Sequence, residues 1–82
     1  MNKEIETRIG NNIRDIRESQ KMTQDTLAAK LQLNGCDITR SAVAKIEVGQ
    51  RHLYPDEIIF IKEILDTDFN SIFYGINNGD TQ

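Results

Sequence analysis

Apolar residues at helical spacing are the feature that most restricts the fold of this chain. Ile5, Ile9, Ile13 and Ile16 follow one another at intervals of four, four and three residues, so they line one face of a helix. No segment alternates apolar and polar residues over a length sufficient for a β-strand. The sequence therefore predicts an all-α protein.

Capping signals divide the rest of the chain into four further short helices. Thr23, Thr39 and Asp68 stand where N-caps belong, and Pro55 suits the first position of a helix. Turn or C-cap signals close three of the helices at Asn34-Gly35, Gly49 and Gly75. We expect five helices around one core, the third covering about residues 39–48 and the last running from Phe69 to Tyr74.

The length of the chain, 82 residues, is that of one small domain with a thin core. We expect residues 1–75 to form this domain, because no linker-like stretch divides them. Residues 76–82 have little apolar surface to bury, which predicts a disordered tail.

Several classes of protein and site are disfavoured by the composition. Cys36 is the sole cysteine, which excludes an internal disulfide and a multi-cysteine metal site, and we interpret it as an incidental loop thiol. The first ten residues have no apolar run of signal-peptide length, and no run could span a membrane. There is no glycine-rich phosphate loop and no nucleophile with a base and an orienting partner. We therefore expect a cytoplasmic protein that is not an enzyme and needs no metal or cofactor.

The charge is distributed unevenly along the chain. The formal net charge is −3, which by itself argues against a nucleic-acid partner. Residues 1–52, however, have nine Lys or Arg and seven Asp or Glu, a balance of +2, whereas residues 53–82 have one Lys and six acidic residues, a balance of −5. An interaction surface at one end of the molecule is compatible with this asymmetry.

The third expected helix combines small residues with exposed donors near its start. Arg40, Ser41 and Lys45 can share one face, and Ala44 would allow that face to approach a partner closely. The major groove of DNA is about 12 Å wide and accepts one helix, whose early residues meet the base edges. This pattern favours a helix that reads DNA.

At this point the sequence resembles the phage repressor and Cro family of helix-turn-helix regulators, also called XRE-type. The resemblance covers roughly residues 9–75. It implies a five-helix lambda-repressor-like bundle that contains a helix-turn-helix. The segments that match are Ile13-Arg14-Asp15-Ile16-Arg17, Met22-Thr23-Gln24 with Leu27-Ala28, Thr39 to Glu47, and Gly49-Gln50-Arg51.

The resemblance also implies roles for individual residues. A structural ion pair would join Arg17 on the first helix to Glu47 on the third. The residues expected at base edges are Arg40, Ser41, Ala44 and Lys45. The residues expected at the DNA phosphates are Thr23, Gln24, Gln50, Arg51 and His52.

The sequence departs from the family pattern in the connection between the second and third helices. Residues 32–37 stand where relatives usually have a single glycine, so the connection is about five residues longer and the second helix can extend through Leu33. Asp37 adds a negative charge near the expected DNA surface, and Ala44 and Val48 replace polar residues that relatives often have there.

The resemblance implies a sequence-specific regulator of transcription, a repressor, that binds double-stranded DNA as a homodimer on an inverted repeat. The candidate dimer surface consists of Ile59, Phe60, Phe69, Phe73 and Tyr74. The net acidity and the long connection leave an alternative open, in which the same fold binds a protein partner, as an antirepressor or antitoxin does. The resemblance further implies a bacterial or phage-encoded protein.

Overall fold

The computed structural model describes residues 2–76 and contains five α-helices within that range. Residues 77–82, which make up nearly all of the expected tail, lie outside the described part. The helices are α1 (Lys3–Ser19), α2 (Gln24–Leu33), α3 (Arg40–Glu47), α4 (Pro55–Ile64) and α5 (Phe69–Tyr74). The all-helical architecture predicted from the sequence is confirmed over these residues.

Side-chain caps fix where three of the helices begin. The hydroxyl of Thr23 accepts from the backbone N–H of Thr26, and the hydroxyl of Thr39 accepts from that of Ala42, both at 3.1 Å. The Asp68 carboxylate accepts from the backbone N–H of Ser71 in the same way. Each of these bonds satisfies an N–H that has no partner inside its helix, so the local sequence sets the boundary.

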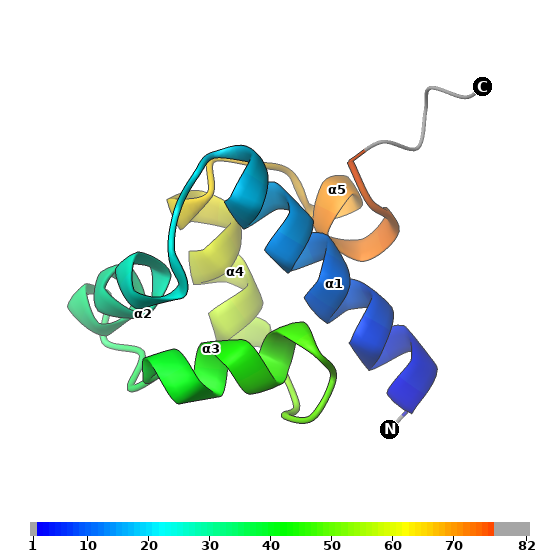
Figure 1. Cartoon of the computed structure of the whole chain (residues 1–82), viewed down its shortest axis with the longest axis horizontal. Helices are drawn as coiled ribbons and strands as arrows, with labels where there is room; N and C mark the ends of the chain where they lie inside the picture. Colours follow the sequence, from blue (N-terminus) through cyan, green and yellow to red (C-terminus); the bar gives the residue numbers. More distant parts are fainter. Residues whose placement is uncertain (1, 77–82) are drawn as a thin grey trace.

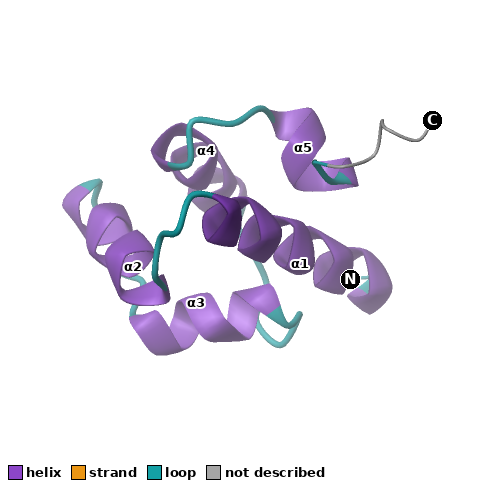
Figure 2. Ribbon diagram, turned by 45° about the horizontal axis from the view of Figure 1, so that its top comes forward, coloured by secondary structure: helices purple, strands orange, loops and turns teal. Residues whose placement is uncertain are grey.

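The helices surround one hydrophobic core. Helix α1 packs against α3 and α5, while α2 packs against α3 and α4, and Figures 1 and 2 show α1 passing between the α3 and α5 ends of the molecule. Thirteen apolar side chains are buried in this core: Ile13, Ile16, Leu27, Ala28, Leu31, Cys36, Ile38, Val43, Ile46, Leu53, Ile61, Leu65 and Ile72. None of the helices in residues 2–76 is both long enough and apolar enough to cross a membrane.

The apolar stripe of α1 is buried over only part of its length. Ile13 and Ile16 are in the core and Ile9 packs against it, but Ile5 is 46% exposed. The first turn of α1 lies at the edge of the bundle, next to the loop that follows α3 (Figure 1). Glu6 in this turn contacts His52 in that loop. The stripe predicted from the sequence therefore lies on one helix, but its first member, Ile5, remains outside the core.

The connection between α2 and α3 is anchored to the core. Gly35 has a left-handed backbone conformation, with φ of 88°, directly after the end of α2. Beyond this turn Cys36 and Ile38 turn their side chains inward, and the Gln32 side chain donates to the backbone carbonyl of Ile38 at 2.8 Å. Cys36 lies in the loop, as expected from the sequence, but its side chain is buried in the core, and this burial raises the pKa of its thiol.

Candidate functional site

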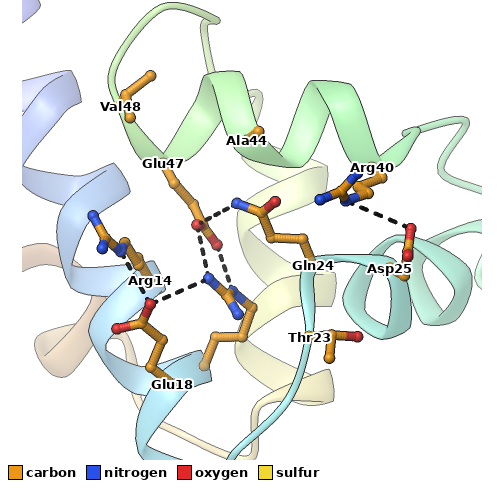
Figure 3. A pocket seen from close by; sticks show the side chains of 10 residues that line it. Arg14, Glu18, Thr23, Gln24, Asp25, Arg40, Ala44, Glu47 and Val48 are labelled. Atoms are coloured by element: carbon orange, nitrogen blue, oxygen red, sulfur yellow. Dashed lines mark hydrogen bonds and ion pairs between the residues drawn. The ribbon is translucent and has the colours of Figure 1, made fainter.

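A groove of about 570 Å³ lies where the last turns of α1, the start of α2 and one side of α3 meet (Figure 3). Its walls carry three arginines and three acidic residues, together with polar and small side chains. The lining residues are Arg14, Arg17, Glu18, Thr23, Gln24, Asp25, Arg40, Ala44, Glu47 and Val48. The groove therefore joins a helix-turn-helix pair, α2 and α3, to the helix that precedes it.

A buried ion pair forms the floor of this groove. The Nε and Nη2 atoms of Arg17 donate to the two carboxylate oxygens of Glu47 at 2.7 and 3.0 Å. The hydrogen bond to Glu47 raises the pKa of Arg17, outweighing the opposing effect of burial. A further guanidinium N–H donates to the backbone carbonyl of Met22, just before α2. One side chain thus ties α1 to both α3 and the approach to α2.

Gln24 belongs to the same network. Its side-chain amide donates to a carboxylate oxygen of Glu47 at 3.0 Å (Figure 3). Gln24 is the first residue of α2, so this bond connects the start of the second helix to the end of the third. The relative placement of the two helices is consequently fixed by polar contacts as well as by the core.

The outward face of α3 presents the residues expected at base edges. Val43, Ile46 and Glu47 point inward, whereas the side chains on the opposite side of the helix are exposed or partly exposed. That outward set is Arg40, Ser41, Ala44, Lys45 and Val48. A second hollow of about 520 Å³ extends along Gln24, Thr39 and this face.

Four charged residues of the groove form two exposed ion pairs that were not predicted from the sequence. Arg14 donates to Glu18 at 3.2 Å, one turn away along α1, and Arg40 Nε lies 3.8 Å from an Asp25 carboxylate oxygen. A sequence signal exists for the first pair, because an arginine and a glutamate four residues apart face each other on a helix. The second pair joins different helices and has no local signal.

The residues expected at the DNA phosphates fall into two groups. Thr23 and Gln24 lie in the groove at the N-terminus of α2. Gln50, Arg51 and His52 lie in the loop between α3 and α4; Gln50 is exposed, whereas Arg51 and His52 are partly buried. The histidine Nδ1 lies 3.1 Å from a carboxylate oxygen of Glu6.

Arg51 is held by a carboxylate rather than presented freely. It makes two hydrogen bonds to Glu57, of 2.9 and 3.1 Å, at the start of α4. Burial opposes ionisation of Glu57, but the hydrogen bonds from Arg51 and from the backbone N–H of Tyr54 leave the pKa of this carboxyl below its ordinary value. Much of the positive charge expected in this loop is therefore neutralised within the protein.

The candidate dimer residues differ in their exposure. Ile59, Phe69 and Tyr74 are 45%, 41% and 68% exposed. Phe60 and Phe73 are partly buried and pack against the core, and Phe73 also stacks on Phe69 with ring centroids 6.2 Å apart. Only the first three side chains leave a substantial apolar area uncovered.

Comparison with known proteins identifies the family. A family model described as helix-turn-helix, of the Cro/C1 type, matches residues 13–72, which include all of α2, α3 and α4. No match was found among curated proteins or among solved structures. Among residues 2–76, no group of three or more His, Cys, Asp or Glu side chains could hold a metal ion. The matched segment contains the parts of α1, α2 and α3 that line the groove, together with the Arg17–Glu47 ion pair. The chain belongs to the Cro/C1-type helix-turn-helix family of DNA-binding regulators of transcription.

Proposed function

We propose that this protein is a repressor that binds an operator by placing α3 in the major groove. The observation that carries the proposal is the outward face of α3, where Arg40, Ser41 and Lys45 are exposed beside the small side chain of Ala44. Arginine and lysine donate to the two major-groove acceptors of guanine, and serine can donate or accept. A small residue between them allows the helix backbone to approach the base edges.

Phosphate contacts would come first from the start of α2. Thr23 caps this helix and Gln24 follows it, so both lie at the positive end of the helix dipole, where phosphate groups bind well. Gln50 would contribute from the loop after α3. Arg51 and His52 reach a phosphate only by releasing or sharing Glu57 and Glu6, so we assign them a smaller part.

We further propose a homodimer formed through the exposed apolar residues of α4 and α5. Ile59, Phe69 and Tyr74 would be the central contacts, with Phe60 and Phe73 supporting them. A twofold dimer would present two copies of α3 to half-sites about 34 Å apart, and hence to an inverted repeat. A dimer bound at a promoter would repress transcription by excluding polymerase.

The base contacts can be tested by selecting bound duplexes from a random-sequence DNA pool. The wild-type chain is expected to enrich an inverted repeat, and an Arg40→Ala/Lys45→Ala variant to lose that enrichment. A matched control is Arg8→Ala/Lys30→Ala, which removes the same charge from exposed positions outside the groove. Equal loss in both double variants would contradict base reading by α3, and no enrichment by the folded wild type would contradict the DNA-reading function.

The dimer surface has its own test in solution. A Phe69→Gln/Tyr74→Gln variant is expected to shift the molar mass measured by light scattering from dimer to monomer. Leu33→Gln is the matched control, because Leu33 is 87% exposed at the far end of α2 and belongs to no proposed contact. A wild type that is monomeric on its operator would contradict the dimer.

A second candidate function is a protein-binding module of the same fold, as in antirepressors or antitoxins. The observation that favours it is charge pairing: Arg14, Arg17, Arg40 and Arg51 each lie within 4.0 Å of a carboxylate. Such pairing reduces the charge available for phosphates. The affinity for duplex DNA, measured over a series of salt concentrations, distinguishes the two functions. A DNA-binding regulator loses affinity steeply as salt rises, because its phosphate contacts release counterions, whereas a protein-binding module shows no such salt-dependent binding to duplex.

A further inference from the structure

We infer that Asp25 is a positioning residue that directs Arg40 toward base edges and away from phosphates. This inference rests on the proposed function. Asp25 matches no expected contact, and a negative charge on a DNA-binding surface weakens affinity unless it has another use. Asp25 lies beside Arg40, the first residue of α3, and this position suggests that use.

The geometry joins the two side chains across the gap between α2 and α3. Arg40 Nε lies 3.8 Å from Asp25 Oδ1, and a dashed line marks this contact between the two helices in Figure 3. Asp25 is the second residue of α2, where the helix dipole favours a carboxylate. The carboxylate is thus fixed to a short, capped part of the scaffold, and Arg40 is the partner that adjusts.

The exposure of both side chains favours an orienting role for the pair over a stabilising one. The Arg40 and Asp25 side chains are 67% and 77% exposed, and exposed ion pairs contribute little to stability. The same exposure leaves donors of the guanidinium free. With its Nε edge toward Asp25, the other edge of the planar group can donate to both O6 and N7 of a guanine.

The neighbouring groups explain why an arginine here needs such a partner. The N-terminus of α2 attracts phosphates. An unpaired guanidinium next to it would bind those phosphates at least as strongly as it binds a base edge. The negative charge of Asp25 repels a phosphate at the position of Arg40. The cost is a lower overall affinity for DNA, and the gain is a larger difference between correct and incorrect base pairs.

The experiment uses the full chain and the duplex that the wild type selects. The base pair read by Arg40 is the one whose preference disappears in Arg40→Ala. Affinity is then measured for this duplex, for the same duplex with that base pair changed, and for random duplex, over a series of salt concentrations. The variants are Asp25→Asn, Asp25→Glu, Asp37→Asn and the Asp25→Asn/Arg40→Ala double variant.

Asp25→Asn is expected to bind random duplex more tightly and to lose about five- to tenfold in discrimination at the Arg40 base pair. Its slope of log affinity against log salt should steepen by about one, as for one additional phosphate contact. Asp25→Glu should retain most of the discrimination. In the Arg40→Ala background, Asp25→Asn should leave unchanged the remaining preference for the selected duplex over random duplex, whereas a merely structural role in placing α3 would lower it.

Asp37→Asn is the matched control, because Asp37 is also exposed and lies in the connection before α3. It should raise affinity for every duplex without altering discrimination. If Asp25→Asn behaves in the same way, the positioning role is overturned while base reading by α3 stands. If the wild type selects no duplex, both the proposed function and this inference fail. Thermal unfolding of each variant verifies that the fold is kept.

Discussion

Arg17 on α1 and Glu47 on α3, thirty residues apart in the sequence, are joined by two hydrogen bonds. Their side chains are 8% and 1% exposed, and Gln24 donates to the same carboxylate. Together with the Arg17 bond to the Met22 carbonyl, this network holds α1, α2 and α3 in one arrangement. The outward face of α3 depends on that arrangement for its orientation.

Glu47→Gln is expected to lower the free energy of unfolding by about 3 kcal/mol, because it leaves the buried Arg17 charge with only the exposed Glu18 carboxylate, 3.8 Å away, as a counter-charge. The measurement is urea-induced unfolding followed by circular dichroism. Arg14→Ala is the control, since it removes an exposed pair with Glu18 that contributes about 0.3–0.5 kcal/mol. Equal losses of unfolding free energy in the two variants would show that the buried pair stabilises the protein no more than the exposed pair does.

Thr39→Ala is expected to cost about 1 kcal/mol, because the backbone N–H of Ala42 loses its capping partner at the start of α3. Operator affinity should fall with it, since Arg40 and Ser41 occupy the turn that frays. Thr39→Ser keeps the hydroxyl and should retain both stability and affinity. An unchanged melting temperature in Thr39→Ala would contradict a stabilising cap.

Gly10→Ala should destabilise the protein although alanine is the better helix former. A Cβ at this position would fall on the backbone carbonyl oxygen of Ile46, so α1 and α3 must move apart. The helix-propensity gain is about 1 kcal/mol, and the overlap should cost more, on the order of 1–3 kcal/mol or above. Asn11→Ala, at the exposed neighbouring position of α1, is the control and should change stability little. Greater stability of Gly10→Ala would mean that the two helices can separate without cost.

Acidification should destabilise the protein partly through Glu57. Because the pKa of Glu57 is lowered in the folded state, its contribution is complete above the unfolded-state pKa, about 4.3, and is lost as the pH falls through the folded-state pKa. Glu57→Gln keeps an acceptor for the Tyr54 N–H but removes the charge that faces Arg51. The difference in unfolding free energy between wild type and variant should therefore narrow from pH 6 toward pH 3, which is measurable by urea titration at each pH. If the difference in unfolding free energy stays constant with pH, protonation of Glu57 is not linked to folding.

Local sequence determined the helices and several of their ends. Thr23, Thr39 and Asp68 cap the segments that follow them because each hydroxyl or carboxylate reaches an N–H only three residues away. The order of segments that identifies the family is also readable from the chain, and the family model matches over residues 13–72. These features need no knowledge of which distant residues meet.

Tertiary structure decided which charges remain available on the surface. The pairing of Asp25 with Arg40, of Arg51 with Glu57 and of Glu6 with His52 joins residues of different helices or loops, and no spacing rule predicts it. The close approach of α1 to α3 at Gly10 and the burial of Cys36 are likewise consequences of packing. The physical reason is range: a cap or a helical stripe is set by neighbours along the chain, whereas an ion pair or a buried side chain is set by neighbours that only the folded core brings together.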